Sequence, residues 1–350
     1  MILIYIVLWD GFETILMARR VARRLRITRA FYTLTWTPWA RLSGFVPGGN
    51  RRESFLSIYG PLSFVLLLGI WAGTLITGFA LLYWGAGTVM HVPPETEGFS
   101  AHLYFSGSTF FTLGLGDVRP ITTFGRVLTV IEAGTGFGFL ALVIGFLPGL
   151  SEAFSRREVN IALLDARAGS PPTALELLRR HGNVAGCRDL SDFLHDWERW
   201  SSELLESHIS FPVLAFFRSQ HDNQSWLGAL TTVLDSAALV VVGIDGAPTR
   251  PAWLTFAMAR HAMVDMCSVL HVAPREPSRE RLSAEDLSRL RQELESAGIP
   301  LRDGDEADAK LRELRAMYEP YAIALELHLR MRLPEWLPRE PVKENWQGGA

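Results

Sequence analysis

One short segment combines threonine, glycine and aspartate in an order that could hold a cation. Residues 106–120 read Ser-Gly-Ser-Thr-Phe-Phe-Thr-Leu-Gly-Leu-Gly-Asp-Val-Arg-Pro and lie between two long uncharged runs. In an ion-selectivity filter, backbone carbonyls point toward one narrow axis and replace the water around the ion. That arrangement needs alternating backbone conformations, and glycine adopts those with positive φ at little steric cost. The segment therefore predicts a filter, with Thr112 adding a hydroxyl ring at its inner mouth.

Two acidic side chains, one at the end of the glycine pattern and one in the following apolar run, have expected supporting roles. Asp117 follows the last glycine and can accept hydrogen bonds from pore-helix donors behind the outer mouth. Glu132 lies inside the next apolar run, and we expect it to accept hydrogen bonds from the pore-helix end of its own or a neighbouring chain. A structural role and a gating role of Glu132 both stay open.

Two apolar runs flank the filter and predict membrane-spanning helices. Pro61 to Tyr83 is 23 residues long without a charge, and Val127 to Leu150 carries Glu132 as its single charge. Helices of this length span the hydrocarbon core of a bilayer. Between them, residues 99–111 are long enough for a pore helix that enters the membrane partway.

The first 17 residues are apolar but contain Asp10 and Glu13. Two interpretations stay open for this segment, an interfacial or re-entrant helix and a third span whose acids face protein or headgroups. We favour the third span, with the N-terminus outside. The segment is not a signal peptide, because its basic residues follow the apolar stretch.

Arginines between the apolar segments predict the orientation. Residues 85–123 contain only one arginine or lysine, Arg119, whereas residues 18–53 contain nine arginines. Since arginine-rich loops face the cytoplasm, the outer end of the filter should face outward. We expect anionic lipids, and no nucleic acid, to contact this cluster. Its members are Arg19, Arg20, Arg23, Arg24, Arg26, Arg29, Arg41, Arg51 and Arg52.

One chain supplies one filter strand, whereas a ring of carbonyls needs about four. We therefore expect a homotetramer around a shared axis. The second span contains Gly134, Gly136, Gly138 and Gly145. Glycines inside a helix allow either close helix contacts or a bend that opens the inner mouth. Both functions stay open, and we assign Gly136 as the favoured gating hinge.

Residues 99–150 resemble the pore module of bacterial two-span potassium channels, the ion channel or two-pore-domain-like potassium channel family. The resemblance is carried by Ser108 to Pro120, then by Gly125-Arg126 and Glu132-Ala133. It implies selective passage of K⁺ along backbone carbonyls, with K⁺ as the permeant ion and no cofactor. The expected site consists of the filter residues Thr112, Leu113, Gly114, Leu115 and Gly116, the supporting residues Ser108, Tyr104, Asp117 and Glu132, and the hinge Gly136.

The sequence departs from that family at Leu115, where tyrosine or phenylalanine is commoner. A leucine cannot hydrogen-bond to pore-helix aromatics such as Tyr104, so the ring of partners around the filter should be weaker. Phe111 also replaces the usual second threonine or serine. We therefore predict imperfect selectivity for K⁺ over Na⁺, or inactivation at the filter.

The second half of the chain is charge-rich and follows helical periodicity. Ser283-Ala-Glu-Asp286 predicts a capped helix start, and residues 306–332 predict one long helix. Asp235 to Val242 is apolar and fits a buried helix or strand. Cys187 and Cys267 match no disulfide or metal spacing and are expected to be reduced.

Two His-Asp pairs, His195-Asp196 and His221-Asp222, support an alternative function. Imidazole and carboxylate together bind divalent metals, so the chain could be a membrane-anchored helical enzyme or signalling protein. The spacing matches no signature, and this alternative leaves the filter string unexplained. We therefore predict an ion channel rather than an enzyme.

Together these features predict an all-α multi-pass protein of the inner (plasma) membrane. The cytoplasmic C-terminal half is expected to modulate the pore and could bind a cytosolic ligand of unknown chemistry. The predicted parts are an N-terminal hydrophobic helix (1–17), an Arg-rich cytoplasmic or interfacial segment (18–56), a pore domain (57–150), a helical cytosolic domain (151–338) and a disordered tail (339–350).

Overall fold

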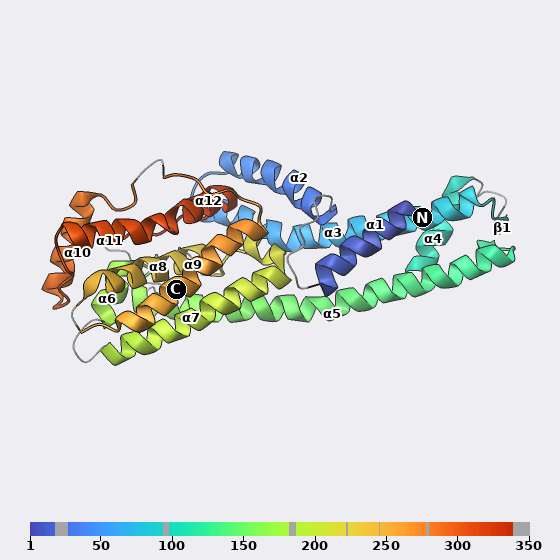
Figure 1. The fold of residues 1–350 in the computed structure, drawn as a ribbon. Coiled ribbons are helices and arrows are strands. Elements are labelled where there is room, and N and C mark those ends of the chain that lie inside the picture. Colours follow the sequence, from blue (N-terminus) through green and yellow to red (C-terminus); the bar gives the residue numbers. More distant parts are fainter. Residues whose placement is uncertain are drawn as a thin grey trace. The chain divides into compact units, whose positions relative to one another are not determined.

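The computed structural model describes residues 1–17, 27–93, 98–181, 187–221, 223–244, 246–277 and 280–338. Helices make up nearly all of the regular structure of these residues, which confirms the all-α fold class (Figure 1). The sheet found among them is one antiparallel pair, β1 (Met90–His91) against β2 (Arg119–Pro120). The predicted tail at 339–350 and five of the nine clustered arginines lie outside the described residues.

The chain forms two compact units. The first contains Met1–Arg41 and Ile58–Glu152, and the second contains Leu42–Ser57 and the described residues from Ala153 onward. The helices of the first unit are α1 (Ile2–Gly11), a π-helix (Phe12–Leu16), α2 (Ile27–Leu42), α3 (Asn50–Gly85), α4 (Phe99–Phe110) and α5 (Thr123–Ala168). α3 and α5 each extend by two or more turns into the second unit, and α2 ends on the first residue of that unit, Leu42. A 3-10 turn, Ser43–Phe45, follows α2.

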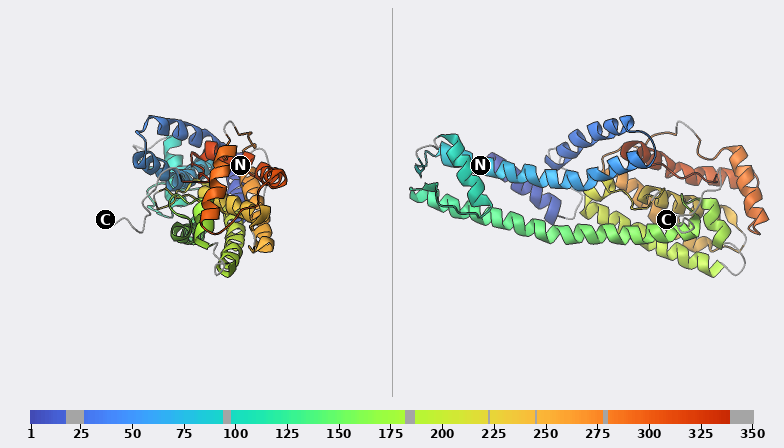
Figure 2. Two further views of the ribbon diagram at one scale, coloured as in Figure 1. Left: turned by 90° about the vertical axis from the view of Figure 1, so that its left-hand side faces the viewer. Right: turned by 180° about the vertical axis from the view of Figure 1, so that it is seen from behind.

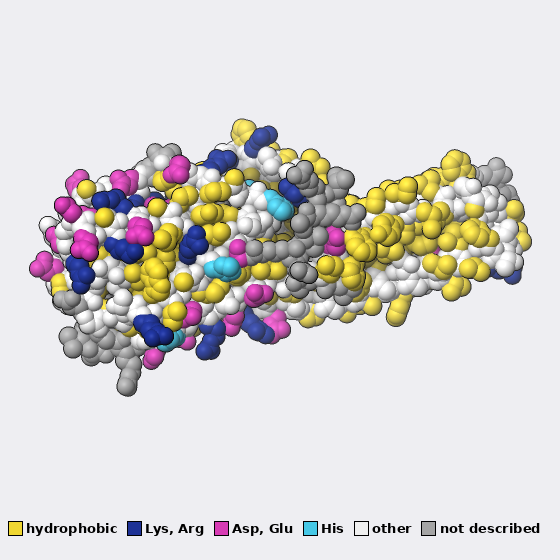
Figure 3. All heavy atoms as spheres, viewed as in Figure 1, with side chains coloured by type: hydrophobic (Ala, Val, Ile, Leu, Met, Phe, Trp, Pro, Cys, Tyr) yellow, Lys and Arg dark blue, Asp and Glu magenta, His cyan; other side chains and the backbone are white. Residues whose placement is uncertain are grey.

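Both predicted spans lie within helices long and apolar enough to cross a membrane, α3 and α5. The surface over α1, α3, α4 and α5 is largely hydrophobic, whereas charged side chains gather over the second unit (Figure 3). A third helix of sufficient length, α8 (Trp226–Gly243), has 89% of its apolar window buried inside the protein. Because protein already covers its apolar side chains, α8 is a core helix of the second unit.

The N-terminal helix packs along α3. A Cβ on Gly78 would lie 2.8 Å from Cγ1 of Ile4, and Asp10 Oδ2 accepts a hydrogen bond of 3.2 Å from Trp71 Nε1. Ile4, near the start of α1, thus lies beside Gly78, and Asp10, near its end, lies beside the earlier residue Trp71. The two helices therefore run antiparallel. Asp10 is buried in protein and also accepts hydrogen bonds from the backbone N–H and the hydroxyl of Thr28. That α1 crosses the membrane stays a prediction.

The inner helix extends farther than the sequence predicts. Its apolar run ends at Leu150, but α5 continues without interruption to Ala168 and includes Pro148. The extension persists because Ile161, Leu164 and Ala168 form a buried helical stripe in the second unit. The inner helix is thus built directly into that unit.

The second unit is a bundle of helices. Its further members are α6 (Ala174–His181), α7 (Cys187–Ser210), a 3-10 helix (Pro212–Phe216), α9 (Thr249–Val269), α10 (Ala284–Ser296), α11 (Asp305–Ala316) and α12 (Glu319–Leu329). α7 and α8 both pack against α9, and α6, α11 and α12 contact α8 (Figure 2). The apolar run at 235–242 is therefore helix, at the centre of the bundle.

Local signals predicted one helix boundary in this unit and missed another. The Ser283 hydroxyl accepts a hydrogen bond of 3.1 Å from the Asp286 backbone N–H, which confirms the predicted cap. The single helix predicted over 306–332 is wrong, because the chain breaks at Met317 and Tyr318 between α11 and α12. Pro320 lacks a backbone donor and fits only the first turn of a new helix.

Candidate functional site

The candidate filter begins where the pore helix α4 ends. The Leu113 backbone N–H donates to the Ser108 carbonyl at 2.8 Å, and the Thr112 N–H donates to the Thr109 carbonyl at 3.0 Å. These bonds use helix-end carbonyls that would otherwise lack partners, and they fix the start of the filter to α4. Ser108 thus contacts the start of the candidate filter through its backbone carbonyl, and its supporting role stays a prediction.

The filter backbone alternates in conformation. Thr112, Gly114 and Gly116 have positive φ values of 56°, 59° and 79°. Two of these three positions are glycines, as the left-handed region favours. The side chains of Leu113 and Leu115, at the intervening positions, are 64% and 63% exposed in the single chain. In the single chain, these two leucines are therefore not buried in the protein.

The end of the candidate filter near Asp117 is tied to α4 by a side-chain contact. The Tyr104 hydroxyl on α4 donates to Asp117 Oδ2 at 2.9 Å. The structure thus brings together two of the sequence-predicted supporting residues. Immediately after Asp117, β2 pairs with β1, and the Ile121 N–H donates to the Val89 carbonyl at 3.0 Å. This short sheet holds the chain between the filter and α5 against the end of α3.

Glu132 connects three helices from a fully buried position on α5. One carboxylate oxygen accepts a hydrogen bond from the Ser106 hydroxyl of α4, and the other accepts one of 2.9 Å from the Tyr83 hydroxyl of α3. Both donors belong to the same chain: Ser106 lies within α4, and Tyr83 lies in the last turn of α3. Since a buried carboxylate is costly without such partners, the three residues specify how the helices pack.

At Gly136, α5 closely approaches the end of the pore helix. A Cβ at this position would lie 2.0 Å from the Phe110 carbonyl oxygen, whereas none at Gly134 or Gly138 would meet an atom within 4 Å. Close packing therefore explains why position 136 is glycine. Its role as a gating hinge stays a prediction, and α5 is helical through this position.

Comparisons with known proteins agree with this geometry. Residues 65–148 match the sequence model of a family described as ion channel. The match runs from α3 through the pore helix and filter into α5. The chain is a membrane protein with an ion channel domain.

The similarity to a whole protein is broader. The chain is 25% identical over 279 residues to the uncharacterized membrane protein YdjJ of Bacillus subtilis (strain 168). The aligned part covers 78% of this chain and 77% of that protein, so it includes much of the second unit. No solved structure matches the chain.

The predicted His-Asp pairs do not form a site in the described part of the chain. His195 lies on α7 with its side chain 56% exposed, 3.8 Å from Glu198, and His221 is exposed. Asp222 lies outside the described residues. No group of three or more His, Cys, Asp or Glu side chains among the described residues could hold a metal ion. Nothing in this geometry favours the enzyme alternative.

Cys267 gives no sign of a reactive or metal-binding thiol. Cys267 is buried, its thiol donates to the Tyr321 carbonyl at 3.5 Å, and burial raises its pKa to about 12. A thiol that stays protonated is a poor nucleophile and a poor metal ligand. The side chain of Cys187 lies outside the described part.

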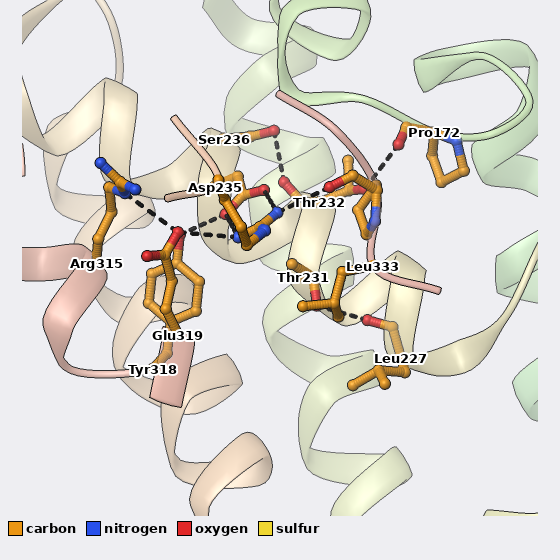
Figure 4. A network of polar contacts seen from close by, with 12 residues as sticks. Pro172, Leu227, Thr231, Thr232, Asp235, Ser236, Arg315, Tyr318, Glu319 and Leu333 are labelled. Atoms are coloured by element: carbon orange, nitrogen blue, oxygen red, sulfur yellow. Dashed lines mark hydrogen bonds and ion pairs between the residues drawn. The ribbon is translucent and has the colours of Figure 1, made fainter. Parts of the chain in front are cut away.

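A buried charged network in the second unit was missed by sequence reasoning. The two terminal nitrogens of the Arg281 guanidinium donate to the two carboxylate oxygens of Asp235, at 2.7 and 3.2 Å. Arg281 also forms an ion pair of 3.1 Å with Glu319. Tyr318 donates its hydroxyl to Asp235, and Arg315 binds Glu319 at 3.1 Å (Figure 4). Two acids and two arginines balance in charge. Asp235, the one charge in an otherwise uncharged helix, was the available signal.

This network joins α8 to the elements that follow it. Burial raises the pKa of the Tyr318 hydroxyl, which therefore acts as a donor, and burial raises the pKa of Glu319 against the opposing effect of both arginines. Arg281 also donates to the Pro334 carbonyl at 3.0 Å. Because its charged groups face one another, the network is a structural clamp on the C-terminal part of the unit.

Proposed function

We propose that this protein conducts K⁺ passively through a filter formed by residues 112–116 of four chains. The observation that carries the proposal is the alternation of backbone conformation at Thr112, Gly114 and Gly116, next to a pore helix and within the ion channel match. A chain with this alternation can present successive carbonyls to one axis. Thr112 would add its hydroxyl at the inner mouth.

Assembly into a homotetramer follows from the proposal, because one chain contributes one wall of the filter. Two features support it. The filter residues are exposed in the single chain, and only 11% of the apolar window of α5 is buried. Lipid can cover an apolar helix but cannot satisfy filter carbonyls. Further copies of the chain around an axis would bury the apolar face of α5 and would enclose the filter carbonyls around a shared pore.

Selectivity for K⁺ over Na⁺ is expected to be imperfect, or the filter to inactivate. Leu115 offers no hydrogen bond to the pore helix, and the Tyr104 hydroxyl is directed to Asp117 instead. The bond between Tyr104 and Asp117 is a single, solvent-exposed hydrogen bond. It would hold the outer end of the filter but not its middle.

The orientation and surroundings follow from charge. We place the protein in the plasma membrane, with the second unit in the cytoplasm and the outer end of the filter outside. Arg29 and Arg41 on α2 are exposed beside exposed Leu34. Such a surface suits the inner headgroup layer and its anionic lipids. The second unit would modulate gating, which includes bending of α5 at Gly136, and could bind a cytosolic ligand.

The deciding experiment measures uptake of a rubidium tracer into liposomes containing the purified protein. Gly114→Ala and Gly116→Ala, made separately, should abolish most of the flux while expression is unchanged. For an alanine, the left-handed backbone conformation is destabilising by about 1–2 kcal/mol in each subunit. Gly73→Ala on α3, where a Cβ meets no atom within 4 Å, is the matched control. Flux that survives both filter substitutions would refute the proposal.

A further inference from the structure

The cytoplasmic extension of the inner helix is fastened to one short segment of the second unit. Arg157 of α5 is 3% exposed, and its two terminal nitrogens donate to the carbonyls of Leu214 and Phe217, each at 2.9 Å. Its remaining nitrogen donates to Glu158 at 3.0 Å. These carbonyls belong to residues 211–220, which follow α7 and which we call the 211–220 segment.

The neighbouring acid strengthens the same attachment. Glu158 is buried, and it accepts hydrogen bonds from the Ser219 hydroxyl and, at 3.3 Å, from the Gln220 backbone N–H. The rings of Phe154 and Phe217 lie 5.6 Å apart beside this contact. Removing one partner of a buried charge pair leaves an uncompensated charge, so this attachment should not open during gating. Any motion of the α5 end therefore carries the 211–220 segment with it.

The same segment also reaches the beginning of the outer helix. The guanidinium of Arg218 lies 3.4 Å from the carboxylate of Glu53, in the first turn of α3. Arg218 is held independently, because it donates to the carbonyls of Leu329 and Arg330 at 2.5 and 3.2 Å. Its side chain is 7% exposed, whereas that of Glu53 is 57% exposed. The pair can therefore break by departure of Glu53 alone.

We propose that Arg218 and Glu53 form a latch between the two helices that flank the filter. This inference rests on the proposed channel function. Arg157 and Glu158 attach the 211–220 segment permanently to the inner helix, and the exposed ion pair attaches it reversibly to the outer helix. The latch stabilises the conformation seen here, and a gating motion of the α5 end relative to α3 must break it. An exposed pair of this kind shifts such an equilibrium about two- to fivefold per subunit.

Single-channel recording of the full-length protein in planar bilayers tests the latch. Glu53→Gln should shift the ratio of open to closed time about two- to fivefold per subunit, and Glu53→Lys should shift it further in the same direction. Raising the ionic strength with an impermeant salt should shift the wild-type ratio as Glu53→Gln does, and should have little further effect on that variant. Single-channel conductance and reversal potential should not change, because Glu53 is not part of the filter. Glu295→Gln and Glu295→Lys, at an exposed acid on α10, are the matched controls.

The outcomes separate the two proposals. A conducting wild type whose Glu53 variants open and close as it does would overturn the latch and leave the channel function standing. An equal shift in the Glu295 variants would also overturn it, because the effect would then reflect net charge. A wild-type protein that passes no ions would overturn the channel function, and the latch with it.

Discussion

Single residues in this protein are constrained for different physical reasons, even where their type is the same. Gly114 is required by its backbone conformation, whereas Gly136 is required because the Phe110 carbonyl occupies the space of a side chain. His208 shows a third constraint. It is fully buried on α7, its Nδ1 lies 2.7 Å from the Leu204 carbonyl, and its ring packs 5.4 Å from that of Trp226.

The environment of His208 predicts a pH-dependent stability. Burial, assisted by the positive charge of Arg157, lowers the pKa of His208 to about 3. Between this value and the usual 6.5 the unfolded chain binds a proton that the folded chain does not, so stability falls as the pH falls. From pH 7 to pH 5 the loss should approach about 2 kcal/mol.

Thermal unfolding of the solubilised protein at pH 7 and pH 5 measures this effect. His208→Leu should reduce the difference between the two pH values, whereas His195→Leu, at an exposed histidine of the same helix, should leave it unchanged. Equal pH sensitivity in the wild type and in His208→Leu would show that other groups are responsible.

At the scale of elements, the pore helix is held by its neighbours through a few specific contacts. Glu132 binds Ser106 on α4 and Tyr83 on α3, and Gly136 lets α5 approach the end of α4. These contacts fix the depth and the rotation of α4. Because the filter backbone continues directly from α4, its geometry depends on how closely α5 packs.

Gly136→Ala should therefore push α5 away from the pore helix. Overpacking of this kind costs about 1–3 kcal/mol, so we expect an unfolding temperature several degrees lower and a reduced ion flux. Gly138→Ala is the control, since a Cβ there meets no atom of the same chain within 4 Å and alanine favours a helix.

Thermal unfolding and tracer flux should be measured on the same preparations. If Gly136→Ala matched Gly138→Ala in both, close packing would not explain the glycine.

At the scale of the whole molecule, two units share two continuous helices. α3 and α5 each belong partly to the first unit and partly to the second. The second unit is therefore joined to both helices that flank residues 112–116 without a separate linker. Under the proposed function, a change within the second unit would reach both flanks of the filter through helical backbone.

The proposed assembly makes a direct prediction. The protein in detergent or lipid nanodiscs should have four times the chain mass of 39.1 kDa, because each chain supplies one filter wall. Native mass spectrometry measures this value. A chain that is monomeric in both environments would be incompatible with a carbonyl filter shared around an axis.

The sequence by itself determined the features that depend on consecutive residues. The lengths of the apolar runs predicted two spans, the capping residues predicted the start of α10, and the glycine spacing predicted an alternating backbone at 112–116. Each of these follows from local chemistry, because span length, capping and backbone freedom are properties of a short stretch of chain.

Only the tertiary structure decided the contacts that join distant residues. The pairing of Tyr104 with Asp117, the approach of Gly136 to Phe110 and the attachment of Arg157 to the 211–220 segment depend on how helices pack. The continuation of α5 beyond Leu150 has the same origin, since its buried stripe acquires partners only when the second unit folds around it. Packing selects one arrangement among many that the local pattern allows, and for this reason sequence periodicity could not reveal it.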